Sequence, residues 1–155
     1  MHENDSIDHL HNSLVQEIEG FRKYDRNKAR YDLLPKSASL LIQYESDLFK
    51  AYYESMTSKS QEEQLATLTR LLKRLRDHCI LDDIASVVAY GADKYGDDNW
   101  KKVSGTGRYW AALGRHISAM GDAGGNDIDC ESGLSHAAHA STNILFLIDL
   151  ITNNV

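Results

Sequence analysis

Proline is nearly absent from this chain: Pro35 is the only one among 155 residues. Because proline removes a backbone N–H donor and interrupts helices, its scarcity leaves long stretches free to be helical. Apolar residues recur along these stretches at the 3.6-residue period of a helix, and no run of alternating β-branched residues indicates a strand. The sequence therefore predicts an all-α fold.

The chain has 155 residues, a length that a single domain commonly has, so one domain is predicted over residues 1–155. A first amphipathic helix carries Ile7, Leu10, Leu14 and Ile18 and ends at Gly20. Further helices are expected over 36–56, 61–79, 82–95, 108–121 and 132–151, with polar or glycine-rich loops at 97–107 and 122–129. The two helices within 36–80 predict an antiparallel helical hairpin.

Charge and composition exclude several classes of protein. The formal net charge is −6, whereas a non-specific nucleic-acid binder would carry a basic patch. No apolar run reaches the roughly 18 residues of a membrane-spanning helix. Cys79 and Cys130 fit no zinc-site spacing, which indicates free thiols in a reducing compartment, and the polar N-terminus is unlike a signal peptide. We therefore expect a cytoplasmic protein without nucleic-acid or membrane partners.

Polar groups gather where the last predicted helix begins. Carboxylates occupy every second position just before it, at Asp127, Asp129 and Glu131, and they could turn toward one hard cation. His136, His139 and Asn143 then share one helical face through their i, i+3, i+7 spacing. Burying two imidazoles and an amide without purpose would be costly. The alternative is structural, because acidic residues before a helix commonly cap it and complement its dipole.

A second candidate group lies around the end of the predicted 82–95 helix. Cations, an amide and aromatic rings are concentrated there, at Lys94, Tyr95, Asn99, Trp100 and Lys101. Lysines suit phosphate oxygens, and an aromatic ring could stack on a base. An ordinary helix C-terminus, capped by Gly96 and followed by lysines, accounts for the same residues. No GxxxxGK[ST] motif occurs, which excludes Walker-type phosphate binding.

Two weaker groups complete the candidates. His116 follows Arg115 beside the apolar stripe of the 108–121 helix, so its ring could enter the same cavity as the histidines of the last helix. Near residue 30, Lys28, Arg30 and Asp32 offer two cations and a carboxylate before a helix. A helix cap and a surface ion pair are the simpler interpretation of that second group.

Taken in order, these motifs resemble one family. The resemblance rests on KARYDLLP at 28–35, YGADKYG at 90–96, Asn99-Trp100, Arg108-Tyr109, Arg115-His116, and DCESGLSH at 129–136 followed by His139 and Asn143. The chain is similar in them to the phage dATP/dGTP diphosphohydrolases of the MazZ type, which belong with the MazG-like all-α nucleotide pyrophosphohydrolases. It departs from that pattern in two ways: the 36–80 hairpin resembles an insertion, and the usual ExxE and ExxD helices are not clear.

The resemblance implies a MazG-like helical bundle that forms a homo-oligomer, a dimer or a tetramer. It also implies dependence on about two or three Mg²⁺ or Mn²⁺ ions. The substrate would be a purine deoxynucleoside triphosphate, dGTP or dATP or both, which is converted to the monophosphate and pyrophosphate. In a phage setting this reaction would belong to purine deoxynucleotide metabolism in the host cytoplasm.

Roles for single residues are a hypothesis that combines the candidate groups with this resemblance. The expected metal ligands are Asp127, Asp129, Glu131 and His136, and the expected catalytic residues are Glu131, Lys94, His116 and His139. Substrate contacts are expected from Lys28, Arg30, Asp32, Tyr95, Asn99, Trp100, Lys101, Arg115 and Asn143.

Two alternatives stay open at this point. Water could attack elsewhere, giving nucleoside and triphosphate. The protein could also be a non-catalytic nucleotide sensor or interaction module, with the hairpin as its interaction arm.

Overall fold

A computed structural model describes residues 28–121 and 128–153 of the chain. Two expectations lie outside the described residues: the first helix, with Ile7 and Ile18, and the metal ligand Asp127. Within the described ranges every regular element is a helix, and the one β contact is an isolated bridge between Ile128 and Ser135. The all-α prediction is confirmed.

The helices follow one another along the chain with short connections. In order they are η1 (Tyr31–Leu33), η2 (Lys36–Ala38), α3 (Ser39–Ile42), α4 (Asp47–Met56), α5 (Gln61–Leu75), α6 (Leu81–Tyr95), η3 (Asn99–Lys102), α7 (Gly107–Met120) and α8 (His136–Asn153). None of these described helices combines the length and the apolar character needed to cross a bilayer.

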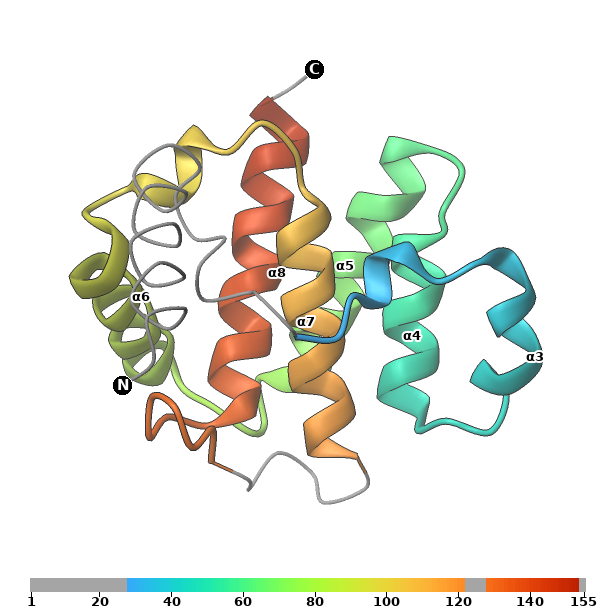
Figure 1. Ribbon diagram of the computed structural model, residues 1–155, viewed down its shortest axis with the longest axis horizontal. Helices are drawn as coiled ribbons and strands as arrows, with labels where there is room; N and C mark the ends of the chain where they lie inside the picture. Colours follow the sequence, from blue (N-terminus) through green and yellow to red (C-terminus); the bar gives the residue numbers. More distant parts are fainter. Residues whose placement is uncertain (1–27, 122–127, 154–155) are drawn as a thin grey trace, which may run out of the picture.

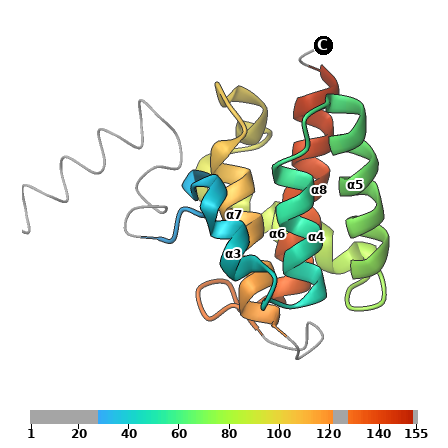
Figure 2. The same cartoon turned by 90° about the vertical axis from the view of Figure 1, so that its right-hand side faces the viewer.

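Helices α7 and α8 form an antiparallel pair at the centre of the molecule (Figure 1). Helix α6 packs on α8 from one side, whereas α4 packs on α7 and α5 packs on α8 from the other. Turning the molecule shows α4, α5, α7 and α8 side by side as a bundle, with α3 outside it (Figure 2). The short helix η1, which precedes α3 and α4 in the chain, packs on α7.

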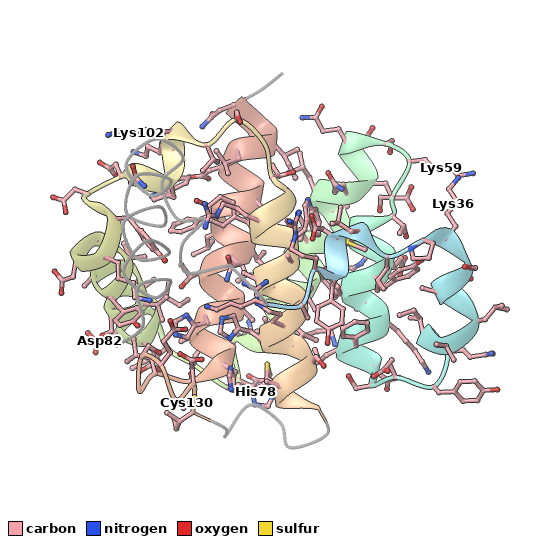
Figure 3. All side chains as sticks on the ribbon, viewed as in Figure 1. Lys36, Lys59, His78, Asp82, Lys102 and Cys130 are labelled. Atoms are coloured by element: carbon pink, nitrogen blue, oxygen red, sulfur yellow. The ribbon has the colours of Figure 1, made fainter. Side chains whose placement is uncertain are left out.

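The core lies where α8 meets the helices on both sides of it. Leu113 and Ile117 of α7, Ile144 and Leu147 of α8, and Leu68 of α5 are fully buried there. Small residues let the helices approach α8 closely, and Ala137, Ala138, Ala140 and Ser141 are all buried. Charged side chains such as those of Lys36, Lys59 and Lys102 extend outward from the ribbon instead (Figure 3).

The single helix expected over 36–56 is wrong, because the chain breaks between α3 and α4. Ser46 adopts an extended conformation there (ψ 158°), and its hydroxyl accepts a hydrogen bond from the backbone N–H of Phe49. This is an N-cap, which satisfies a free donor at the start of α4 and favours a new helix over continuation of the old one. The break leaves α3 as a single turn at the edge of the bundle.

The last helix also begins later than expected, at His136 rather than near residue 132. Residues 129–135 form a tight turn, in which the N–H of Asp129 donates to the carbonyl of Leu134 at 2.8 Å. Gly133 has a φ of 74°, a left-handed conformation that favours glycine. The Ser135 hydroxyl then accepts a hydrogen bond from the N–H of Ala138 and caps the helix.

Helices α4 and α5 are part of the bundle core, so they do not form the free arm considered above. Phe49 and Tyr52 of α4 and Leu68, Leu71 and Leu75 of α5 are buried against α7 and α8. Ser60 caps α5 by accepting a hydrogen bond from the N–H of Glu63, as Ser46 does for α4. That the 36–80 segment is an insertion relative to its family stays a prediction.

One close contact sets the distance between α4 and α7. Tyr52 is completely buried, and its hydroxyl donates to the Trp110 carbonyl at 2.7 Å. Burial is the main reason that the pKa of Tyr52 is raised, which keeps this hydroxyl a donor. One turn later, Gly114 faces the same ring: a Cβ there would lie 2.7 Å from the Tyr52 hydroxyl and 2.9 Å from Cβ of Tyr31.

We therefore expect the Gly114→Ala substitution to destabilise the protein. The added methyl group overpacks a buried contact, which typically costs about 1–3 kcal/mol in the free energy of unfolding. Urea denaturation followed by circular dichroism measures it, with Gly105→Ala as the matched control, because a Cβ at that position meets nothing within 4 Å. Equal stability of the two variants would show that the α4–α7 contact is not tight.

Candidate functional site

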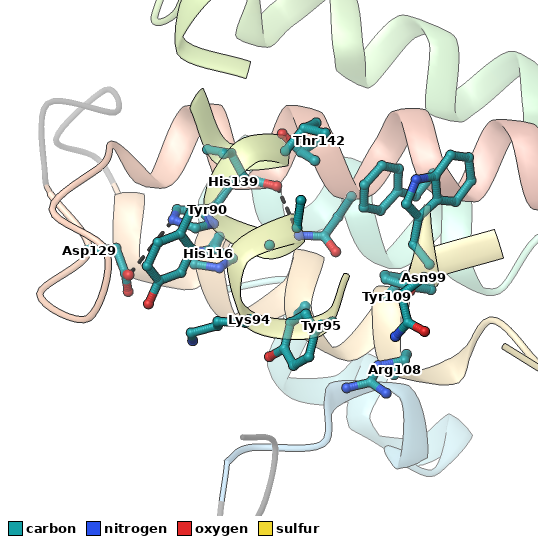
Figure 4. A pocket seen from close by; sticks show the side chains of 18 of the residues that line it. Tyr90, Lys94, Tyr95, Asn99, Arg108, Tyr109, His116, Asp129, His139 and Thr142 are labelled. Carbon is teal, nitrogen blue, oxygen red and sulfur yellow. Dashed lines mark hydrogen bonds and ion pairs between the residues drawn. The ribbon is translucent and has the colours of Figure 1, made fainter. Parts of the chain in front are cut away.

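A cavity of about 340 Å³ lies between α6 on one side and the α7–α8 pair on the other. Its two ends differ in chemistry (Figure 4): Asp129, His116 and Lys94 lie at one end, and Asn99 and Tyr109 lie toward the other. The first is called the ionic end below, and the second the aromatic end.

The ionic end is built around two histidines and a carboxylate. His116 comes from α7, Asp129 from the turn before α8, and His136 from the first turn of α8. One ligand atom from each lies within 4.8 Å of the other two, and the Nδ1 atoms of His116 and His136 are 2.9 Å apart. Two imidazoles and a carboxylate at this spacing can hold one divalent metal ion.

His139 supports this group from the next turn of α8. Its ring stacks on that of His116 with centroids 4.5 Å apart and planes within 7°. Its Nε2 atom lies 2.6 Å from the Ser132 hydroxyl and 3.7 Å from an oxygen of Asp129. His139 therefore contacts two of the three candidate ligands, a position from which it can orient them.

The protonation states of these residues suit metal binding. Burial, reinforced by the nearby His139 and His136, lowers the pKa of His116 to about 3. Burial also lowers the pKa of His139, although Asp129 opposes the change. For Asp129 burial acts to raise the pKa, but hydrogen bonds from Ser132 outweigh it, so the pKa falls. Near neutral pH, His116 and His139 are thus neutral and Asp129 is ionised, and these are the forms that coordinate metals.

Glu131 lies beside this group but is paired with two lysines. Its carboxylate is 3.1 Å from the ammonium of Lys28 and 3.4 Å from that of Lys94. Burial acts to raise the pKa of Glu131, but the two lysines outweigh it, so this pKa is lowered. Burial acts to lower the pKa of Lys94, but Tyr90 and Glu131 outweigh it, so this pKa is raised. Glu131 is not in the group whose ligand atoms converge, so the structure offers His116 there in its place.

Lys28 reaches this position because the segment before η1 is held against α7. The Arg115 guanidinium donates to the carbonyl of Ala29 at 3.0 Å, and the Tyr31 hydroxyl donates to Ser118 at 3.2 Å. The residues in these two contacts are 86 and 87 positions apart in sequence. The contacts bring Lys28 to one oxygen of the Glu131 carboxylate, and α6 brings Lys94 to the other.

Aromatic rings form the other end of the cavity. Trp100 stacks on Phe146 of α8 with centroids 4.2 Å apart and planes within 6°, and Tyr109 meets Phe146 edge-on at 5.6 Å. The Trp100 face that touches Phe146 is thus taken and does not stack on a ligand. Polar groups from Asn99 and Arg108 also line this end.

Most of the predicted site residues meet in this one cavity. Those that line it are Lys28, Lys94, Tyr95, Asn99, Trp100, Arg115, His116, Asp129, Glu131, His136, His139 and Asn143. Three others are not among its lining residues. Arg30 and Asp32 form a two-point ion pair with each other at 2.8 and 2.9 Å, and Lys101 pairs with Asp98 at 3.4 Å.

Several lining residues received no site role from the sequence, among them Phe146 and two residues of the family motifs, Tyr90 and Tyr109. Periodicity could have found Phe146, because it continues the face of His139 and Asn143 at i+7 and i+3. Tyr109 similarly precedes His116 by seven residues on α7. Tyr90 opens the YGADKYG motif and precedes Lys94 by four residues, but its contact with Glu131 could not be predicted, since this hydrogen bond joins residues 41 positions apart.

Comparison with known proteins assigns the chain to a family. A family model described as dATP/dGTP diphosphohydrolase, N-terminal, matches residues 57–155. The chain is also 37% identical over 79 residues to the dATP/dGTP diphosphohydrolase of Salmonella phage PMBT28. That alignment covers 51% of this chain and 26% of the relative, so the chain matches about a quarter of the relative's length. No solved structure matches the chain.

The family match runs from just after α4 to the C-terminus, and it includes α5 through α8 and all the residues that line the cavity except Lys28. It covers more than half of the chain and agrees with the resemblance found in the sequence motifs. The chain therefore belongs to the dATP/dGTP diphosphohydrolase N-terminal family.

Proposed function

We propose that this protein hydrolyses purine deoxynucleoside triphosphates, dGTP or dATP, to the monophosphate and pyrophosphate. One observation carries the proposal: a single cavity joins a metal-capable His–Asp group and two lysines at one end to an aromatic wall at the other. A nucleotide has the same division, with charged phosphates at one end and a flat base at the other. The phosphates would lie at the ionic end and the base at the aromatic end.

The ionic end fits a divalent ion, with His116, Asp129 and His136 as ligands. This mixed set suits Mn²⁺ better than Mg²⁺, because imidazole nitrogen is a poorer ligand for magnesium than oxygen is. When bound, such an ion would polarise the phosphate and lower the pKa of a nearby water. Further ions, which the resemblance implies, would need other carboxylates, such as Glu131.

The protein's own cations complete the proposed chemistry. Lys94 is four-fifths buried, with 19% of its side chain exposed, and it is charged, so it can neutralise the phosphates without strong screening by solvent. In the reaction, the water oxygen bonds to the α-phosphorus while the bond from that phosphorus to the α–β bridging oxygen breaks. Pyrophosphate leaves with the bridging oxygen, and the water proton passes to solvent.

Assembly and setting extend the proposal. The homo-oligomer, a dimer or a tetramer, and the role in phage purine metabolism within the host cytoplasm remain predictions from the family resemblance. The absence of nucleic-acid partners remains a prediction from net charge.

We expect dGTP incubated with the protein and Mn²⁺ to yield dGMP and pyrophosphate, because attack at the α-phosphorus releases both β- and γ-phosphates together. Ion-exchange chromatography separates these products from deoxyguanosine and triphosphate. Recovery of the latter pair would move the scissile bond to the sugar, and no turnover of any deoxynucleotide with metal present would favour a sensor.

We expect Asp129→Asn to remove Mn²⁺ binding and to lower turnover by more than the roughly 10- to 100-fold that loss of an outer-sphere partner costs. The amide keeps the size of the carboxylate but not its charge. Isothermal titration with Mn²⁺ measures the binding. Asp93→Asn is the control, because it makes the same change at an exposed position of α6 that does not line the cavity. Unchanged Mn²⁺ affinity in Asp129→Asn would reject the ligand assignment.

We expect Glu131→Gln to abolish turnover while the far-ultraviolet circular dichroism spectrum stays helical. Glu131 is a surface residue of the turn, with 44% of its side chain exposed, so the fold does not depend on its burial. The same spectrum and a dGTP turnover assay check both halves of this expectation. Full activity in the variant would mean that the Lys28–Glu131–Lys94 contact is structural.

A further inference from the structure

Helix α6 presents one face to the cavity, and Gly91 lies in the middle of it. Val87 and Val88 line the cavity one turn before it, and Lys94 and Tyr95 line it one turn after, at the i±3 and i±4 positions. Gly91 itself is a lining residue. The centre of the helix face that borders the cavity thus consists of bare backbone.

Nothing in the fold itself requires a glycine at this position. A Cβ on Gly91 would meet nothing within 4 Å, unlike Gly114, where the neighbouring helix fills the space. Its φ is not in the left-handed region that favours glycine, which Gly96, Gly121 and Gly133 do occupy. Yet glycine in a helix interior lowers stability by about 1 kcal/mol relative to alanine.

We propose that Gly91 is a substrate-binding contact, at which the sugar of the nucleotide lies directly against the backbone of α6. The inference rests on the proposed function. Lys94, one turn after Gly91, contacts Glu131 at the ionic end, and the chain continues past the end of α6 to Asn99 and Trp100 at the aromatic end. Gly91 lines the same cavity as the residues of both ends, and a Cβ there would meet nothing within 4 Å. Because the sugar joins phosphate to base, the proposal places it in this open space. Any side chain there would occupy the space that the sugar needs.

The test compares Gly91→Ala with the wild-type protein for two ligands in the presence of Mn²⁺. The first is the α,β-methylene analogue of dGTP, which cannot be cleaved at that bond, and the second is inorganic triphosphate, which lacks sugar and base. We expect the methyl group to weaken binding of the analogue by about 10-fold or more, by steric overlap. Binding of triphosphate should stay unchanged, because the ionic end is untouched.

Helix propensity provides an internal check on folding. Gly91→Ala should raise the melting temperature by about 2–4 °C, because alanine favours the helix. The matched control is Ala89→Gly, an exposed position of α6 that does not line the cavity, which should lower the melting temperature and leave both affinities unchanged. The double variant Ala89→Gly/Gly91→Ala keeps the helix composition of the wild type and should still bind the analogue weakly.

Two results would overturn this inference: an unchanged affinity of Gly91→Ala for the analogue, or an equal weakening for the analogue and for triphosphate. The second would mean that the methyl group disturbs the ionic end rather than the sugar. Failure of the proposed function looks different, because the wild-type protein would then not turn over dGTP with Mn²⁺. If the wild-type protein also bound no dGTP analogue, the inference about Gly91 would fall with it.

Discussion

The antiparallel pairing of α7 with α8 is the constraint on which the candidate site depends. It places His116, in the C-terminal part of α7, opposite His136 and His139 at the start of α8, although the sequence separates them by about 20 residues. Neutral imidazoles can lie this close together because charging a buried His116 is unfavourable, as its pKa of about 3 shows. A metal ion would supply the positive charge that these rings do not carry.

The parts of the structure that periodicity determines could be predicted from the sequence. The scarcity of proline correctly indicated that the regular elements of residues 28–121 and 128–153 are helices. The i, i+3, i+7 spacing of His136, His139 and Asn143 correctly placed three polar groups on one helix face, which lines the cavity. Both inferences use repeats that a single helix imposes on its own sequence, whatever it packs against.

Features that depend on competition or on distant contacts could not be predicted in this way. The apolar stripe continues through Ser46, so only the structure shows that its cap hydrogen bond ends one helix and begins another. Likewise, Lys28 and Glu131 are 103 positions apart, and no local pattern pairs them. Trp100 is surrounded in sequence by polar and charged residues, which would suggest an exposed ring, yet Phe146 covers one of its faces. At Ser46 a local cap competes with continuation of the helix, whereas for Lys28 and Trp100 a tertiary partner decides the outcome.

Helix α8 carries the cavity wall on one face and, on its other faces, small residues buried against the rest of the bundle. A mutation that enlarges Ala137, Ala138 or Ala140 would push the helix away from its neighbours and at the same time move His136 and His139 away from His116. A substitution at these buried positions of α8 would therefore change both the folding stability and the geometry of the site. Variation that adapts the protein to a new substrate has more freedom on α6, which packs on α8 and borders the cavity from the opposite side.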